Sequence, residues 1–313
     1  MSEEKRKLII DTDTASDDAV AIIMALREPS VEVLALTVVN GNIPLKLATR
    51  NCLIAVEQAG TYTPPVYVGH DRPLMREAVT AEACHGQDGL GDVGYPDPKL
   101  TTEKEHAVDA IIRILEENPA GTIELVTLGP LTNIAAAFMR APETMKKLKQ
   151  IIIMGGQLYQ PGNWSVTSEF NIFVDAEACD VVLRGGVPFL ISPVELCYGD
   201  CGFDPQERAE IAALSPTGKF AIDCNRAVVE FVKTRYGRNN LQLADPSAMG
   251  VALWPDIRKE VTECFIAVEL GGKYCYGQMI FDYKNHLKLP ANGAVCLSID
   301  VPLYKKRLKE ILK

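Results

Sequence analysis

The fold is decided by residues 8–26, which read LIIDTDTASDDAVAIIMAL. The first three residues of this stretch are apolar and predict a short buried strand. Residues 17–28 predict a helix that Pro29 ends, with Ser16 as its N-cap. A buried strand that turns directly into a helix is typical of an α/β protein with a parallel sheet.

Four aspartates, Asp11, Asp13, Asp17 and Asp18, lie at the junction of this strand and this helix. Ligands of open α/β sheets bind in the crevice at the carboxyl ends of the strands, which is where these side chains fall. Four carboxylates so close together repel one another unless a positive charge lies among them. Because all of their ligand atoms are oxygens, they suit a hard divalent cation such as Ca²⁺ or Mg²⁺.

Strand and helix patterns alternate along most of the chain. Further strands are expected at 33–39, 66–68, 123–128, 151–154 and 189–191, and helices at 45–59, 106–117, 131–139, 176–184, 205–214, 219–233 and 246–253. After residue 260 the pattern changes to strands at 265–270, 276–283 and 295–299, followed by a C-terminal helix. This order predicts an α/β fold with an open, mostly parallel (mixed) sheet of the Rossmann-like kind, helices on both faces and antiparallel strands at one edge. No linker or repeat divides the chain, so we expect a single domain, 1–313.

Net charge, apolar stretches and cysteine spacing exclude several classes of function. The net charge of −9 argues against binding to nucleic acid. No apolar stretch is long enough for a signal peptide or a membrane span, so we expect a cytoplasmic enzyme that does not bind membranes. The nine cysteines are odd in number and irregularly spaced, which favours reduced thiols over a disulfide framework.

Several distant polar residues are candidates to join the aspartates. His85 lies in a Gly-rich loop, where a histidine can donate a proton near neutral pH. Asn163 and the segment Ser168-Glu169-Phe170-Asn171 offer amide and carboxylate groups that suit sugar hydroxyls. The turn at 127–133 leaves a backbone carbonyl that could ligate a metal, although a plain strand-to-helix turn also explains it. Asp245, before a proline, could complete the metal site or simply cap a helix.

Together these residues resemble the inosine–uridine-preferring nucleoside hydrolase family over nearly the whole chain. The Asp-rich block at 11–18 is its most specific signature, although Thr14-Ala15 replaces the family's usual Pro-Gly. The other matching segments follow in the family's order and spacing: Asn40-Gly41-Asn42, His85-Gly86, Leu128 to Asn133, Met154-Gly155-Gly156, Glu169-Phe170-Asn171 and Asp245-Pro246.

The resemblance implies a nucleoside hydrolase fold and a Ca²⁺-dependent hydrolysis of ribonucleosides to free base and ribose, as used in nucleoside salvage. The metal ligands would be Asp13, Asp18, the main-chain carbonyl of Leu128, and Asp245, with Asp13 also the general base. The substrate-binding residues would be Asp17, Asn42, Asn163, Glu169, Phe170, Asn171 and Met154. Asp11 would support this shell from behind. The resemblance also implies a homodimer or homotetramer.

The base half of the site departs from the family. Many members carry a histidine that protonates the leaving base just before the last metal-binding aspartate, and others carry a tryptophan there; this chain has Ala244. Its two tryptophans, Trp164 and Trp254, lie elsewhere in the sequence. We therefore expect His85 or Tyr236 to assist the leaving group, and a modified or bulky nucleoside such as queuosine to be a candidate substrate.

Two other functions compete with this one. A strand followed by Asp-x-Asp-x-Thr also begins phosphatases of the haloacid-dehalogenase type, which would form an aspartyl-phosphate at Asp11. The downstream lysine and acidic pair of that family cannot both be placed in this sequence. The third candidate is a ribonucleoside-binding protein without catalysis, against which the presence of Asp13 argues.

Overall fold

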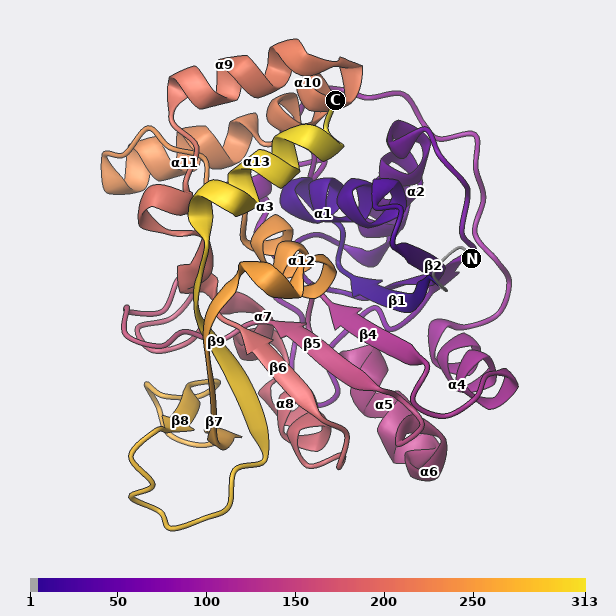
Figure 1. Cartoon of the computed structure of the whole chain (residues 1–313), viewed down its shortest axis with the longest axis vertical. Helices are drawn as coiled ribbons and strands as arrows, with labels where there is room; N and C mark the ends of the chain where they lie inside the picture. The colour runs from indigo at the N-terminus through magenta and orange to yellow at the C-terminus, as the bar shows by residue number, and fades with distance from the viewer. Residues whose placement is uncertain (1–4) are drawn as a thin grey trace.

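A nine-stranded sheet forms the centre of the protein in a computed structural model that describes residues 5–313. Its strand order is β3-β2-β1-β4-β5-β6-β9-β7-β8 (Figure 1). Neighbours from β3 to β9 run parallel, whereas β7 is antiparallel to both β9 and β8. The strands are β1 Arg6–Thr12, β2 Val31–Val38, β3 Val66–Val68, β4 Ile123–Thr127, β5 Gln150–Met154, β6 Phe189–Ser192, β7 Arg258–Val268, β8 Met279–Asp282 and β9 Gly293–Ile299.

Helices cover both faces of this sheet (Figure 1). The α-helices are α1 Ser16–Arg27, α2 Leu45–Ala59, α3 Glu82–His85, α4 Ala107–Glu117, α5 Thr132–Arg140, α6 Pro142–Met145, α7 Phe170–Val174, α8 Ala176–Leu183, α9 Pro205–Leu214, α10 Pro216–Asp223, α11 Arg226–Tyr236, α12 Ala244–Leu253 and α13 Val301–Ile311. Short 3₁₀ turns follow β6 and α12, namely η1 Val194–Cys197, η2 Gly199–Cys201 and η3 Pro255–Ile257. The predicted α/β class, with a mostly parallel mixed sheet, is confirmed.

The two helical layers exist because side chains alternate across each strand. On β1, Leu8 and Ile10 pack with α1, α2 and α12, whereas Ile9 packs with α4, α5 and α8 on the opposite face. On β5, Ile152 faces the first layer, and its neighbours on either side face the second. Because both faces are covered, these strands read as continuous apolar runs, which is why the sequence indicated them clearly.

Two predicted elements are wrong in detail. The single helix expected at 219–233 is two helices, α10 and α11, which are separated at Cys224 and Asn225. There the Asn225 amide donates to the carbonyls of Ser16 (3.1 Å) and Ala221 (3.0 Å), so the break is tied to the start of α1. The strand expected at 265–270 is the second half of β7, which begins at Arg258. Its first half pairs with β9 but is largely exposed and charged, so it shows no apolar alternation.

The N-cap expected at Ser16 is also wrong. Ser16 is the first residue of α1, and Ala15 precedes it as the cap. The Asp18 carboxylate accepts the Ala15 N–H (2.9 Å), which satisfies the backbone at the start of the helix. The Ser16 hydroxyl is therefore available to another partner, and it hydrogen-bonds His85.

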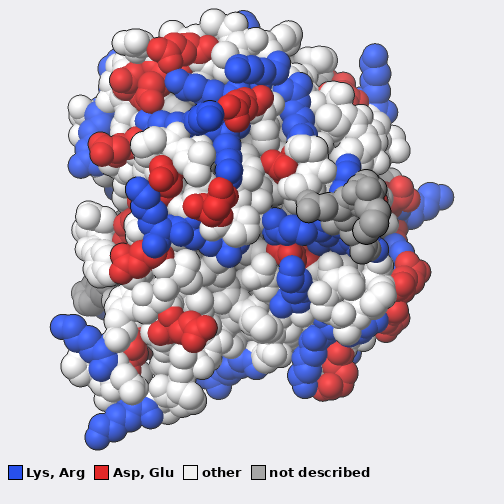
Figure 2. Space-filling view, in the orientation of Figure 1, with Lys and Arg blue, Asp and Glu red and all other residues white. Residues whose placement is uncertain are grey.

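Surface charge is mixed on the face in Figure 2, where Lys and Arg side chains are interspersed with Asp and Glu. Within residues 5–313, no helix combines the length and apolarity needed to cross a membrane. The expectation that the chain has no targeting segment falls partly on residues 1–4, which lie outside the described part. All nine cysteines are free thiols.

Candidate active site

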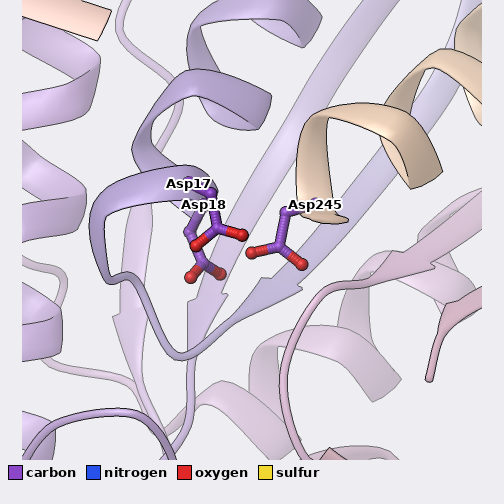
Figure 3. A group of neighbouring side chains, drawn as sticks. All are labelled: Asp17, Asp18 and Asp245. Atoms are coloured by element: carbon purple, nitrogen blue, oxygen red, sulfur yellow. The ribbon is translucent and has the colours of Figure 1, made fainter. Parts of the chain in front are cut away.

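Three carboxylates converge at the carboxyl edge of the sheet (Figure 3). Asp17 and Asp18 extend from the first turn of α1, and Asp245 extends toward them from the first turn of α12. One carboxylate oxygen from each lies within 4.8 Å of the others. The Thr12 hydroxyl donates to Asp18 (2.6 Å) and fixes its orientation. Residues more than 220 positions apart in sequence thus share one site, as the sequence predicted for Asp18 and Asp245.

These carboxylates are buried without a compensating cation. Asp18 and Asp245 are no more than 3% exposed, and no Lys or Arg of residues 5–313 forms an ion pair with either. Burial, followed by the charge of Asp17, raises the pKa of Asp18 to about 7. Burial and the charges of Asp17, Asp18 and Asp13 raise the pKa of Asp245 well above its usual value. Such a group is stabilised by a bound cation.

Asp13 borders the three converging carboxylates. The backbone N–H of Asn42, just beyond β2, donates to Asp13 Oδ2 (2.6 Å). A Cβ at Gly41 would lie only 2.0 Å from the same oxygen, so this backbone must be glycine for the two segments to approach. Asp13 Oδ1 is buried and has no hydrogen-bond partner among the described residues. Burial, followed by the Asp18 charge, raises the pKa of Asp13 well above its usual value.

Asp11 lies one layer deeper than Asp13. Its Oδ2 accepts from the Thr37 hydroxyl (2.6 Å) and from the Asn133 amide (2.9 Å), and burial raises its pKa to about 7. These two hydrogen bonds hold Asp11 Oδ2 against β2 and α5, which suits a supporting residue and gives no support to the phosphatase hypothesis. Beyond its place in the turn at 127–133, no signal in the sequence indicates this role of Asn133, whose amide also donates to the Val38 carbonyl (3.2 Å).

A second group of polar residues, at the ends of β4 and β5, centres on Glu169. It caps α7, with Oε1 accepting from Asn171 N–H (3.0 Å) and Oε2 accepting from Gly156 N–H (3.1 Å). Burial outweighs these hydrogen bonds and raises the pKa of Glu169 to about 7. The Asn163 side-chain oxygen accepts from Phe170 N–H (3.0 Å), which fastens its loop to the same helix.

Asn171 connects this polar group to the end of β4. Its side-chain amide donates to the Leu128 carbonyl (2.7 Å) and contacts the sulfur of Met154 (3.1 Å). A carbonyl oxygen has two lone pairs, so the Leu128 oxygen retains one for another ligand. The structure therefore brings together the predicted residues of β4, β5 and α7 at one edge of the sheet.

The two residues expected to act on the leaving group differ in position. His85 is buried at the end of α3, with Nδ1 2.8 Å from the Ser16 hydroxyl and 3.8 Å from Asp17 Oδ1. Tyr236 ends α11 with about half of its surface exposed (52%), and its ring packs edge-on against Phe231. Its hydroxyl forms no hydrogen bond among residues 5–313. The structure places His85 beside the carboxylates and gives Tyr236 no contact with them.

An apolar wall adjoins His85. Phe170 packs with Ala81 and Val174, and Cys84 and Val79 pack against this cluster. Trp164 lies edge-on to Phe170, with ring centroids 4.9 Å apart, and is 40% exposed. Trp164 directly follows Asn163, a candidate substrate-binding residue, but its contact with Phe170 has no signal in the sequence because this loop has no periodic pattern.

Comparisons with known proteins agree with this arrangement. Residues 8–306 match the family model described as inosine-uridine preferring nucleoside hydrolase. The chain is similar to the pyrimidine-specific ribonucleoside hydrolase RihB of Escherichia coli, with 34% identity over 99% of this chain and 98% of that one. Among solved structures, it is similar to the plant nucleoside hydrolase PpNRh1 (TM-score 0.91, 31% identity, 99% of both chains) and to a purine-preferring ribonucleoside hydrolase from Gardnerella vaginalis (TM-score 0.89, 29% identity, 98% of this chain and 99% of that one). The chain therefore belongs to the inosine–uridine-preferring nucleoside hydrolase family and is an enzyme that hydrolyses the N-glycosidic bond of ribonucleosides.

Proposed function

We propose that the enzyme is Ca²⁺-dependent and releases ribose and free base from a ribonucleoside. One observation carries the metal dependence: three buried carboxylates lie within 4.8 Å of one another, and no Lys or Arg in the described part of the chain is paired with them. Ionised carboxylates at this spacing are unfavourable in a buried environment unless a cation neutralises them. Oxygen-only ligands favour a hard cation of the Ca²⁺ type.

The proposed ligands are Asp13, Asp18, Asp245 and the Leu128 carbonyl. Two features fit them to a cation: Asp13 Oδ1 is buried without a partner, and the Leu128 oxygen has a free lone pair beside its hydrogen bond from Asn171. When bound, Ca²⁺ would position the ribose hydroxyls and lower the pKa of a water molecule. The structure also groups Asp17 with Asp18 and Asp245, so Asp17 is close enough to share the substrate hydroxyls at this position.

The protein's own groups then account for the chemistry. Asp13 accepts a proton from the attacking water as general base. The ribosyl transition state carries developing positive charge, which the surrounding carboxylates stabilise. Asp17, Asn42 and Asn171 hold the 2′- and 3′-hydroxyls, and Asn163 and Glu169 hold the 5′-hydroxyl. Met154 and Phe170 line the sugar, and Asp11 supports Asp13 from beneath, held by its own hydrogen bonds.

The leaving base would meet a different environment. We propose that His85 assists its departure, because His85 is held beside Asp17 by the Ser16 hydroxyl. Tyr236 is the weaker candidate, since it is half exposed and its ring packs against Phe231 and not against the carboxylates. Trp164, which is 40% exposed and packs against Phe170, offers aromatic surface to a large base, which supports a purine or a modified nucleoside such as queuosine as substrate.

Release of reducing sugar tests the proposal directly. Wild-type protein is incubated with purine, pyrimidine and modified nucleosides, with added Ca²⁺ or with a chelator. We expect ribose release that the chelator abolishes and Ca²⁺ restores, and loss of release in Asp13→Asn. Release that is unaffected by the chelator would contradict the metal dependence. Binding of nucleosides without any release would favour the non-catalytic ribonucleoside-binding alternative.

We further propose that residues 1–313 act as one domain in a homodimer or homotetramer. The single domain is supported by the one sheet, which contains both β1 from near the N-terminus and β9 from near the C-terminus. Family resemblance alone supports the oligomer, and light scattering coupled to gel filtration measures it.

A further inference from the structure

Asn40 is a buried side chain whose hydrogen-bonding groups are unused. It follows β2, is 3% exposed, and neither Oδ1 nor Nδ2 has a partner among the described residues. Its backbone N–H donates to the His70 carbonyl (2.9 Å), so its position is fixed. A buried amide without partners is costly, because both groups lose their hydrogen bonds to water. Such a group in a folded protein points to a partner that binds from outside.

A cavity of about 660 Å³ opens beside Asn40. Most of its lining is apolar and comes from the start of α2, the end of β3 and the loop at 78–80, including Ile43, Leu45 and Val68. Its charged residues are Lys46 and Asp71, one of each sign, so the cavity favours a neutral ligand. The volume lies within the range of small-molecule sites, which typically combine apolar walls with a few polar groups.

This cavity adjoins the active site without being part of it. Gly41, which lines the cavity, is the residue whose backbone abuts the Asp13 carboxylate. Val79, on another wall, packs against the cluster that contains Phe170. None of Asp17, Asp18, Asp245 or His85 lines it. A molecule released at the carboxylates therefore has an apolar cavity with an unpaired amide next to it.

We propose that this cavity is an accessory binding site for a free nucleobase, recognised by the Asn40 carboxamide. A carboxamide presents one donor and one acceptor side by side, and nucleobases carry the complementary pair on adjacent atoms of a flat, neutral ring. The apolar walls would contact the faces of that ring. The proposal rests on the proposed function only in that hydrolysis supplies the base; binding itself requires no turnover.

Thermal unfolding with free base tests the site apart from catalysis. The protein is melted with hypoxanthine, with uracil, and with ribose as a control. Asn40→Leu removes both polar groups and keeps the branching of the side chain, although leucine is larger. Ala78→Trp adds bulk to an exposed residue of the cavity lining and leaves Asn40 intact. Asp245→Asn disables the carboxylate cluster and leaves the cavity unchanged.

A base that binds at Asn40 raises the Tm of the wild type and of Asp245→Asn, but not of Asn40→Leu or Ala78→Trp. We also expect the dissociation constant of the free base, measured by calorimetry with Asp245→Asn as the parent protein, to rise about tenfold when Asn40→Leu is added, as for the loss of two neutral hydrogen bonds. Equal Tm shifts in all four proteins, or none in the wild type, would overturn the site. Ribose release without a base effect on Tm would leave the proposed function standing and remove this inference alone.

Discussion

The two ends of strands β1 and β4 treat buried carboxylates in opposite ways. At the amino end, Glu124 is 1% exposed and is paired with Arg6 (2.6 Å) and Lys149 (2.9 Å), with Gln150 also donating (2.9 Å). Burial alone would raise the pKa of Glu124, but these hydrogen bonds outweigh it and hold the pKa at about 2. At the carboxyl end, Asp18 is as deeply buried, yet has no cation beside it, and its pKa rises to about 7.

The two carboxylates are thus held in different ways, Glu124 by cationic side chains and Asp18 by neutral hydrogen-bond donors. At Glu124 the protein provides its own cations, Arg6 and Lys149, and the carboxylate links β1 and β4 to the start of β5. At Asp18 and Asp245, where residues 5–313 provide no Lys or Arg partner, the charge is available to the cation proposed above. Burial of an acidic residue is therefore uninformative by itself, and its partners decide its role.

The largest expected effect is on activity. Asp13→Asn removes the proposed general base and one metal ligand while keeping the shape of the side chain. We expect kcat for ribose release to fall about 10³-fold. Glu124→Gln is the matched control, since it neutralises a carboxylate buried to the same degree, and it should keep kcat within about twofold of the wild type. A comparable loss of kcat in Asp13→Asn and Glu124→Gln would contradict the proposal that only the carboxylates at the carboxyl ends of the strands take part in the reaction.

Low pH should weaken the ion pairs of Glu124 at the amino ends of β1 and β4. The folded-state pKa of Glu124, about 2, lies below the ordinary value of 4.5, so its ion pairs stabilise the fold above pH 4.5. This contribution, up to about 3 kcal/mol, is lost as pH falls from about 4.5 through about 2. Urea unfolding of wild type and Glu124→Gln across this range measures it: the two stabilities should converge toward pH 2. A constant difference would contradict the assigned pKa.

At neutral pH the same substitution should destabilise the protein. Glu124→Gln keeps a side chain able to accept hydrogen bonds but leaves Arg6 and Lys149 without an opposite charge. Since Arg6 is partly exposed, we expect a loss of about 2 kcal/mol in the free energy of unfolding, less than for a completely buried pair. Denaturant unfolding gives this value. An unchanged stability would mean that water replaces the carboxylate fully.

The smallest expected effect has the opposite sign. Asp245→Asn relieves repulsion among Asp17, Asp18 and Asp245, so with chelator present it should stabilise the fold by about 1 kcal/mol. Added Ca²⁺ should raise the Tm of the wild type and have little effect on this variant. Differential scanning calorimetry with and without Ca²⁺ provides both readings. A variant less stable than wild type in chelator would show that Asp245 has a structural partner after all.

Much of the sheet was predictable because its strands are buried on both faces. The apolar runs at 8–10 and 151–154 leave little choice but strand, and the turns after them carry the polar residues of the site. The first half of β7, from Arg258, was not predictable, because its exposed charged residues carry no period-two signal. The break between α10 and α11 depends on a hydrogen bond to Ser16, some 200 residues earlier, which no local pattern contains.

The site shows the same division between local and distant information. The aspartates near β1 are adjacent in sequence, so their convergence could be expected. Asp245 and Asn171 were candidates from their residue types, but only the resemblance to a family assigned them roles beside these aspartates. The surroundings of Asn40 and Trp164 could not be predicted from the sequence. Asn40 is notable because its buried amide has no hydrogen-bond partner among the described residues, and Trp164 because it packs against Phe170.

The tie between Asn225 and the Ser16 carbonyl has a consequence for how this enzyme can diverge. It fastens the root of α11 to the helix that carries Asp17 and Asp18, while most of α11 is exposed and buries only Val228 and Val232. We therefore expect substitutions at the exposed positions of α11 to leave the ribose chemistry intact as long as the hydrogen bond of Asn225 is kept. In this enzyme α11 is therefore a segment in which base preference can evolve while the carboxylates on α1 stay in place.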